Sequence, residues 1–426
     1  MTFKNKAAIH LEALRLWKKG VKLVKKNTKI CEWDPYTTPV IAEKSGIASY
    51  VDLIDGVSIQ ETTDDATGIS SKSVIDWRSQ SKSTDLKPRI TLRDENGDGK
   101  ADIIERFGDY PNDGKFGTEM KINDGYLYYS SELVIYRQLL DPYELIPKGK
   151  PEVVLVDPYP IRWHNAKSLA FDKEDNMYVT FSAPTNACED WDTKPNTYST
   201  ENVKGQYPCE QLELLGGIWK FNKNKLGQSL KDGIRYATGI RSVVGLTWNN
   251  EVNSLYGVNH GRDFLHNHYP QFYSKWDNTV LPAEEFMKIE SGDNYGWPYT
   301  YYDHFQNKRM LAPEYGGNGK IESKDYSNPI MGLPAHWAPN DLLFYTGNQF
   351  PKRYKNGAFI AFHGSTNRMP YPQAGYVVGF IPFEEGVPKG EMEIFADGFI
   401  GREVISDMEE AEHRPMGLAP VSYTHL

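Results

Sequence analysis

The fold is decided by the stretch RYATGIRSVVGLTWN (residues 235–249) and its continuation LYGVNHGRDF (255–264). The first stretch ends in an apolar run and the dipeptide Asn249-Asn250, which favours a turn, and a second apolar run follows. This pattern predicts a β-hairpin. The hairpin leads into Gly261, which lacks a Cβ and would let the neighbouring backbone carbonyls turn towards a ligand or a metal ion.

The composition of the 426-residue chain favours many short strands joined by turns. It has 27 Tyr, 10 Trp, 36 Gly and 26 Pro, a mixture typical of β-rich proteins. The net charge is −9, and no Lys/Arg block alternates with aromatic residues, so we expect no nucleic-acid partner. No apolar run reaches the length of a membrane span, and we expect none.

The pattern of the hairpin recurs along the chain, each time as an apolar strand, a polar turn and a strand ending near Tyr or Phe. The copies are SLAFDKEDNMYVTF (168–181), GLTWNNEVNSLYGV (245–258) and DLLFYTGNQFPKRYKNGAFIAF (341–362), and a further copy begins at GLAP (417–420). Repetition of four-stranded sheets at this spacing predicts an all-β fold, a β-propeller over residues 87–420. One or two β-sandwiches are the alternative.

The two ends of the chain do not follow this pattern. Residues 1–86 form an N-terminal extension of undefined structure, in which we expect a basic amphipathic helix within residues 8–26. The last copy breaks off in VSYTHL, where a turn and a closing strand are expected. We therefore expect an incomplete last blade and a non-native tail over residues 421–426.

An acidic segment near the start of the propeller has the spacing of a twelve-residue calcium loop. Oxygen donors at alternate positions would wrap one cation, and Gly99 would permit the sharp turn. The alternative is an acidic surface turn without a metal. The expected structural calcium ligands are Asp94, Asn96, Asp98, the Lys100 carbonyl, Asp102 and Glu105.

Two of the three cysteines, Cys188 and Cys209, flank a polar insertion with little apolar content. A disulfide that closes this loop is expected, and two free buried thiols are the alternative. A disulfide indicates an oxidising compartment, yet the first 30 residues do not have the pattern of a secretory signal. Either the true start lies upstream, or the protein is cytosolic and the cysteines are reduced.

Several polar residues stand at the ends of predicted inner strands, where a propeller has its central channel. His164 could act as a general base, or it is a hydrogen-bonded structural histidine. Arg241 could bind an anion or a developing oxyanion, or it forms a salt bridge at the rim. Arg368 and Arg414 hold similar positions, and three arginines at one channel would form an anion site. Weaker candidates are Asn186 and His336, and His266 and His268 are interpreted as loop residues.

From about Arg89 to Ala419 the chain resembles the sorbosone dehydrogenase-like family of six-bladed propellers, which is related to soluble glucose dehydrogenases. The motifs that carry the resemblance are RDENGDGKAD, HNAKSLAFD, SAPTNAC, YATGIRSVVGLTW, NHGRD, LPAEEF, GDNYGWPY, PAHWAPN, FYTGNQFP, AFHGSTNR and RPMGLA. The resemblance implies a six-bladed propeller that binds pyrroloquinoline quinone (PQQ) with a calcium ion at the channel mouth.

The resemblance also implies roles for individual residues. His164 would be the base that takes the proton of the sugar hydroxyl, and Arg241 would bind the quinone. The carbonyls of Gly261 and Arg262 would hold the calcium of the cofactor. The cofactor itself would be bound by Arg241, Arg368, Arg414, His336 and Asn186.

Two departures from the family pattern bear on the substrate. Trp163 stands before His164 where the soluble glucose enzymes have an aspartate, and Ser242 stands where they have an asparagine. Glucose specificity is therefore not implied.

We expect a periplasmic or secreted PQQ- and calcium-dependent dehydrogenase that oxidises an aldose or related sugar and passes electrons to an external acceptor. The alternative is a calcium-stabilised propeller that binds carbohydrate or protein without redox activity. A third possibility is calcium-dependent lactone hydrolysis, but it needs a carboxylate-lined metal in the channel, and the sequence does not offer one.

Overall fold

The computed structural model describes short strands between residues 8 and 93, residues 105 and 107, and most of the chain from residue 119 onward. The ranges of that later part are 119–141, 144–159, 163–164, 166–189, 201–347 and 349–420. The chain divides into two compact units, one of Met1–Arg106 with Val421–Leu426 and one of Phe107–Pro420.

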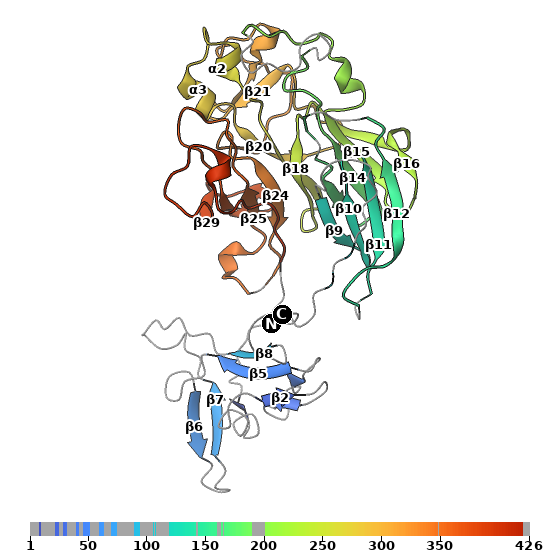
Figure 1. Cartoon of the computed structure of the whole chain (residues 1–426), viewed down its shortest axis with the longest axis vertical. Coiled ribbons are helices and arrows are strands. Elements are labelled where there is room, and N and C mark those ends of the chain that lie inside the picture. Colours follow the sequence, from blue (N-terminus) through green and yellow to red (C-terminus); the bar gives the residue numbers. More distant parts are fainter. Residues whose placement is uncertain are drawn as a thin grey trace. The chain divides into compact units, whose positions relative to one another are not determined.

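The described part of the first unit consists of short antiparallel strands (Figure 1). One sheet has the order β1-β7-β6, a second β2-β5-β8, and a third pairs β3 with β4. Their bounds are β1 Ala8–Ile9, β2 Lys22–Val24, β3 Lys29–Cys31, β4 Val40–Ile41, β5 Gly46–Val51, β6 Ile59–Thr63, β7 Ser70–Val74 and β8 Arg89–Arg93.

The helix predicted within residues 8–26 is wrong where the structure describes this segment, because β1 and β2 are strands there. Their backbones pair with β7 and β5, which lie far away in the sequence. The physical reason is that these partner strands lie tens of residues away, where the local spacing of apolar residues does not show them.

The described residues of the second unit contain four blade-like sheets. Their strand orders are β16-β12-β11-β10-β9, β13-β14-β15-β17, β18-β19-β20-β23 and β24-β25-β26-β29. The bounds are β9 Glu119–Asn123, β10 Tyr126–Ser130, β11 Val134–Leu139, β12 Lys148–Val156, β13 Leu169–Phe171, β14 Asn176–Phe181, β15 Gly217–Asn222, β16 Gln228–Ser229, β17 Ile234–Thr238, β18 Val243–Asn249, β19 Ser254–Asn259, β20 Glu284–Ile289, β23 Met331–Leu333, β24 Pro339–Phe344, β25 Ala358–Phe362, β26 Val377–Ile381 and β29 Glu393–Ala396.

Shorter elements lie in the loops between these strands and after the last of them. They are the strands β21 Thr300–Asp303, β22 Lys308–Leu311, β27 Phe383–Glu384 and β28 Val387–Pro388, the α-helices α2 Leu265–His268 and α3 Lys275–Val280, and the 3₁₀ turns Glu210–Glu213, Leu230–Asp232, Pro313–Tyr315, Lys352–Tyr354 and Met408–Glu410. Figure 1 shows α2, α3 and β21 together at one end of the unit.

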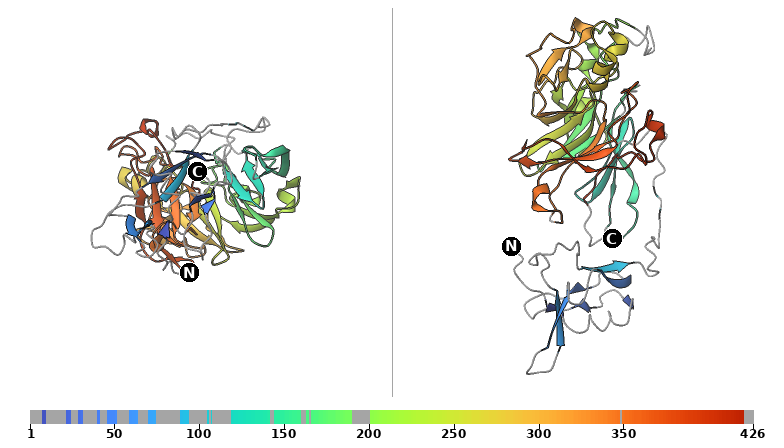
Figure 2. Two further views of the ribbon diagram at one scale, coloured as in Figure 1. Left: turned by 90° about the horizontal axis from the view of Figure 1, so that it is seen from below. Right: turned by 90° about the vertical axis from the view of Figure 1, so that its left-hand side faces the viewer.

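The three complete predicted hairpins are present, and they form the inner part of the second, third and fourth blades. The decisive hairpin pairs β18 with β19, with Trp248 opposite Leu255, and its turn begins after Asn249. The first strands of the blades, β9, β13, β18 and β24, contact one another in that order. Figure 1 shows β18 between the blade of β24 and β25 and the blade of β14 and β15, and Figure 2 gives two further views of the ribbon.

This radial order confirms the all-β propeller and differs from the two stacked sheets of a sandwich. The described residues form four blades. The copy predicted to begin at GLAP (417–420) has no strand in the described part of the chain. Instead the backbone N–H of Leu418 donates to the Asp341 carboxylate at 2.7 Å, and the Leu418 side chain packs against a cluster of the last blade.

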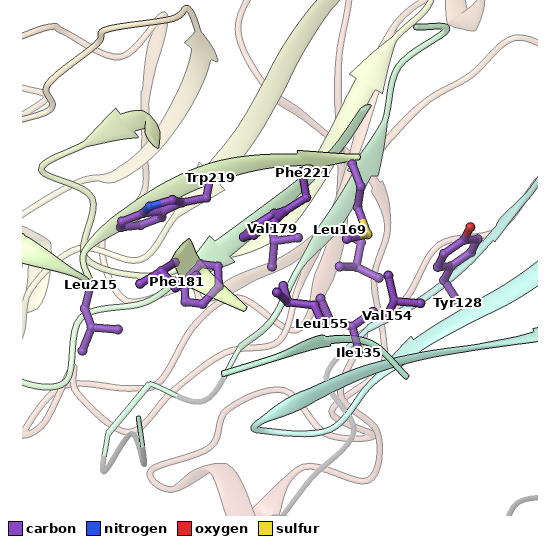
Figure 3. Packing of buried hydrophobic residues seen from close by; sticks show 12 residues of the cluster. Tyr128, Ile135, Val154, Leu155, Leu169, Val179, Phe181, Leu215, Trp219 and Phe221 are labelled. Carbon is purple, nitrogen blue, oxygen red and sulfur yellow. The ribbon is translucent and has the colours of Figure 1, made fainter. Parts of the chain in front are cut away.

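Blades pack face to face through apolar clusters. Ile135, Leu155, Val179 and Phe181 are among the buried residues between the first two blades (Figure 3). A second cluster joins the second and third blades, and a third joins the third and fourth. Because each blade presents apolar residues to its neighbours, the cores fix the blade order and hold the channel ends of the inner strands in place.

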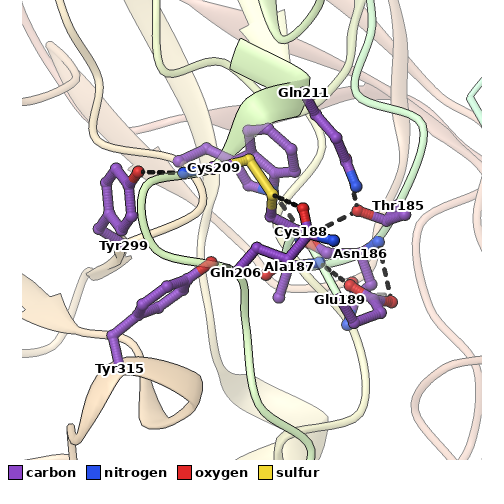
Figure 4. Close-up of a disulfide and its surroundings, with 11 residues drawn as sticks. Thr185, Asn186, Ala187, Cys188, Glu189, Gln206, Cys209, Gln211, Tyr299 and Tyr315 are labelled. Carbon is purple, nitrogen blue, oxygen red and sulfur yellow. Dashed lines mark hydrogen bonds between the residues drawn. A yellow bond between two sulfur atoms is a disulfide. The ribbon is translucent and has the colours of Figure 1, made fainter. Parts of the chain in front are cut away.

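The predicted disulfide between Cys188 and Cys209 is confirmed (Figure 4). Around it, the Thr185 hydroxyl accepts from the Cys188 N–H, and the Tyr299 hydroxyl accepts from the Cys209 N–H. In the described part of the chain, no helix is long and apolar enough to cross a membrane.

Candidate active site

A cavity of about 610 Å³ opens at the ends of the inner strands. His164 precedes β13, Arg241 precedes β18, Asp263 follows β19 and Asn367 follows β25, so residues far apart in sequence meet there because the blades share one centre. The remaining lining consists of aromatic and neutral polar residues together with one methionine, namely Trp163, Phe264, Asn267, Asn278, Thr366 and Met369.

His164 is a neutral imidazole in this cavity. Its Nδ1 lies 2.5 Å from the carbonyl oxygen of Ala183 and must therefore be the protonated nitrogen that donates. Burial, reinforced by the nearby Arg241 cation, lowers the pKa of His164 well below its ordinary value. The lone pair then resides on Nε2, so the ring is a base at neutral pH.

Asp263 is the electrostatic centre of the site. Its Oδ2 accepts from Arg241 Nη2 at 2.8 Å, and its Oδ1 accepts from Asn367 Nδ2 at 2.7 Å. The same Oδ1 lies 3.2 Å from His336 Nδ1. Burial alone would raise the pKa of Asp263, but Arg241 and His336 outweigh it and hold the pKa below its usual range.

His336 is a cation in this network. Its Nδ1 faces the Asp263 carboxylate, and its Nε2 faces the carbonyl of Asn278 at 2.8 Å. With an acceptor at both ring nitrogens, both must donate, which is the geometry of an imidazolium. Burial lowers its pKa, but the Asp263 contact more than offsets this, so the pKa of His336 is raised.

Asn186 links Arg241 and Asp263 through its side-chain amide. Its Oδ1 accepts from Arg241 Nη2 at 3.0 Å and from the Asp263 N–H at 2.9 Å, while its Nδ2 donates to the Asp263 carbonyl at 2.9 Å. Asn186 is buried and lies two residues before the disulfide cysteine Cys188. It therefore positions Arg241 and Asp263 and does not line the cavity itself.

Gly261 and Arg262, the predicted carbonyl ligands of calcium, lie behind Arg241 beside a second cavity of about 20 Å³. The Gly261 carbonyl accepts from Arg241 Nη1 at 2.7 Å, and its N–H donates to Glu284 at 2.6 Å. The Arg262 side chain forms a buried ion pair with Glu314. Their role as metal ligands stays a prediction, and a metal at the Gly261 carbonyl would share that oxygen, which has two lone pairs, with Arg241 Nη1.

Arg368 and Arg414 do not line the cavity, contrary to the predicted convergence of arginines. Arg368 donates to the carbonyls of Thr279, Ala335 and Pro372. Arg414 donates to the carbonyls of His363 and Gly364. The N–H groups of a partly buried guanidinium need hydrogen-bond acceptors, and nearby backbone carbonyls provide them.

The predicted calcium loop lies outside the described residues except for Glu105, which is exposed. In the described part of the chain, no group of three or more His, Cys, Asp or Glu side chains is placed to hold a metal.

The sequence analysis missed three residues of the network: Asp263, Asn367 and Glu284. The first two stand inside quoted motifs, NHGRD and AFHGSTNR, next to residues that were selected. The signal available for Asp263 was its position directly after Arg262, which the resemblance implies to be a calcium ligand. Glu284 in LPAEEF gave no such signal, because nothing in the sequence shows that it accepts from the N–H groups of Gly261 and Ala338.

The residues of the cavity fit a planar anionic quinone. Its volume is in the range of cofactor sites. Arg241 Nε is buried without a hydrogen-bond partner, which leaves a donor for an acidic group. Trp163 and Phe264, with ring centroids 6.4 Å apart, provide aromatic surface beside His164.

The fold and this cavity define a propeller with a candidate active site at the ends of its inner strands. The family model TrAA12-like matches residues 89–426, and the chain therefore belongs to the TrAA12-like family of PQQ-dependent oxidoreductases. The predicted membership among the quinoprotein propellers is thus confirmed.

Solved structures support the same fold. The iodide structure of Trichoderma reesei Carbohydrate-Active Enzymes Family AA12 has a TM-score of 0.51 at 15% identity, and the alignment covers 93% of this chain and 88% of that chain. The calcium structure of the same T. reesei family has a TM-score of 0.50 at 15% identity, covering 82% and 84%.

A separate similarity concerns a fifth of the chain. The DNA-directed RNA polymerase subunit beta' of Ehrlichia ruminantium (strain Gardel) is 51% identical over 84 residues, or 20% of this chain and 6% of the subunit. The subunit of Ehrlichia chaffeensis is 52% identical over 82 residues, or 19% and 6%. This chain therefore spans only a small part of the length of these polymerase subunits.

Proposed function

We propose that the chain oxidises an aldose or a related sugar at a C–OH group, with His164 as the general base. Such an oxidation removes a proton from the hydroxyl oxygen and a hydride from the carbon. When bound, PQQ supplies the acceptor for the hydride. The observation that carries the proposal is a neutral, partly buried His164 whose Nδ1 is fixed on the Ala183 carbonyl beside the cation Arg241.

His164 would receive the proton at Nε2. Because the Ala183 carbonyl anchors Nδ1–H, the ring has one tautomer and one orientation, and the charge formed on proton transfer stays hydrogen-bonded. Asp263 would stabilise that charge through space, since its carboxylate raises the pKa of His164 against the effect of Arg241.

Arg241 would hold an acidic group of the cofactor. Asp263, Asn186 and the Gly261 carbonyl occupy Nη1 and Nη2 and so fix the guanidinium plane. The buried Nε, which has no hydrogen-bond partner, is the donor left for the ligand. Calcium would be held at the carbonyls of Gly261 and Arg262, which lie behind the guanidinium.

We also propose that the protein works in an oxidising compartment, periplasmic or extracellular, and passes electrons to an external acceptor. The support is the Cys188–Cys209 disulfide, since such bonds persist where thiols are not kept reduced.

The experiment is reconstitution of the protein with PQQ and calcium, followed by dye-coupled oxidation of a panel of aldoses. We expect turnover of at least one sugar, and loss of about 10²-fold or more in kcat with His164→Gln, the range of a general base. PQQ binding is measured separately by absorbance, and it should survive His164→Gln.

The matched control is His304→Gln. His304 is another partly buried histidine whose pKa burial lowers, and it does not line the cavity. Unchanged turnover in His164→Gln would refute the role of the base. A folded, calcium-loaded protein that binds no PQQ would instead favour the binding-module alternative.

A further inference from the structure

Two exposed aromatic side chains contact each other, and they belong to two segments, here called the rim, that also contribute residues to the cavity lining. Trp276 is 54% exposed and Tyr371 is 38% exposed, and their rings meet edge to face with centroids 5.3 Å apart. Exposed apolar surface of this kind, next to a cleft, is typical of a ligand-binding surface.

Both aromatics belong to elements that also line the cavity. Trp276 lies on α3, which carries the lining residue Asn278. The N–H of Tyr371 donates to the Arg368 carbonyl at 3.0 Å, closing a turn whose second residue, Met369, lines the cavity and is 61% exposed. Each aromatic thus lies two residues from a residue that lines the cavity.

Hydrogen bonds join α3 to the segment of Asn367 and Arg368. The Thr279 hydroxyl donates to the Arg368 carbonyl at 3.0 Å, and Arg368 Nη1 donates to the Thr279 carbonyl at 3.1 Å. Asn278 Nδ2 donates to the Asn367 carbonyl at 3.2 Å. Arg368, predicted as a cofactor anchor, thus holds the rim in place. A surface held in this way loses little conformational entropy when it binds a ligand.

The chemistry of the rim suits a neutral, hydroxyl-rich ligand. The uncharged polar lining of the cavity consists of three amides and a hydroxyl, Asn267, Asn278, Asn367 and Thr366, which can donate to and accept from sugar hydroxyls. The aromatic surface would pack against the apolar C–H face of a pyranose ring.

We propose that Trp276 and Tyr371 form a second sugar subsite, so that the substrate is an oligosaccharide. Its reducing-end unit would enter the cavity, where the hydroxyl is oxidised, and the next ring would lie against the aromatic pair. This inference rests on the proposed sugar oxidation, and it specifies the substrate class.

The first experiment measures binding without oxidation, on the full chain with PQQ and calcium. Methyl β-glycosides of cellobiose, xylobiose, β-1,4-mannobiose and β-1,4-galactobiose are titrated calorimetrically beside the methyl glycosides of the corresponding monosaccharides. The methyl group blocks the anomeric hydroxyl, so binding is recorded whether or not the protein is a dehydrogenase. We expect at least one disaccharide to bind about ten-fold more tightly than its monosaccharide, a gain that burial of a ring face against aromatic surface would give.

The variants are Trp276→Ala and Tyr371→Ala, with Trp276→Phe as the conservative change. The alanine variants should lose the preference for the disaccharide, and Trp276→Phe should keep most of it. Tyr207→Ala is the matched control, since Tyr207 is 83% exposed and also forms an edge-to-face pair, with Tyr299, away from the cavity lining. In turnover of the free sugars, the alanine variants should raise KM for the disaccharide about ten-fold and leave kcat and the monosaccharide KM unchanged.

The inference is overturned if no disaccharide in the panel binds better than its monosaccharide, or if the preference survives both alanine variants. A preference that depends on Trp276, combined with no oxidation of any free sugar, would keep the subsite and refute the proposed function.

Discussion

Replacement of Asp263 by asparagine tests the electrostatic network directly. The carboxylate faces two buried cations, Arg241 at 2.8 Å and His336 at 3.2 Å, and a side-chain amide at 2.7 Å. Asp263→Asn keeps the size of the side chain and removes its charge. Removing one partner of a buried ion pair costs about 3–5 kcal/mol, because the remaining charge is left uncompensated. We expect a loss of free energy of unfolding in this range, at its lower end because His336 can respond by losing its proton.

The assay is urea denaturation at pH 7, combined with NMR of the histidine ring protons. The contact with Asp263 raises the pKa of His336, so the ring is charged in the wild type and should become neutral at the same pH in the variant. Glu393→Gln is the control, since its ion pair with Arg353 is exposed and its loss should not change stability measurably. A loss of unfolding free energy below about 1 kcal/mol for Asp263→Asn would show that the two cations are solvated. It would refute the buried ion pairs of Asp263 with Arg241 and His336.

Three further outcomes follow from the same structure. The pKa of His164 lies well below its ordinary value, so kcat/KM should stay flat as the pH falls to 6.5 and decline only below it; a decline centred near pH 6.5 would contradict a desolvated base. Burial raises the pKa of Glu284 to about 7, so the folded protein binds more protons than the unfolded chain between about pH 4.5 and 7. The free energy of unfolding should therefore fall as the pH rises through this window, and Glu284→Gln should make it less dependent on pH. An identical pH dependence in the variant would contradict a raised pKa of Glu284. Replacing Cys188 and Cys209 by serine opens a loop with a sequence separation of 21 and should cost about 3 kcal/mol in urea denaturation, and no loss would mean that the loop is held by its other contacts.

The local pattern of the sequence was sufficient for the hairpins and for the class of fold. Alternating apolar residues and Asn or Gly turns predicted the pairs β13–β14, β18–β19 and β24–β25, because strand period and turn chemistry are properties of neighbouring residues. The disulfide was predicted for a similar reason, since a polar loop between two cysteines has little core of its own. The helix within residues 8–26 failed because the strand partners of β1 and β2 lie tens of residues away.

The sequence alone also placed His164 and Arg241 at one channel, since both stand at the start of an inner strand and inner strands share a centre. Only the tertiary structure decided what each charged group contacts. Asp263 became the partner of Arg241 and His336, while Arg368 and Arg414 turned to backbone carbonyls. The physical reason is that ion pairs and hydrogen bonds are chosen by distance in space and by the cost of burying an unpaired donor, and neither quantity is encoded in the spacing of residues along the chain.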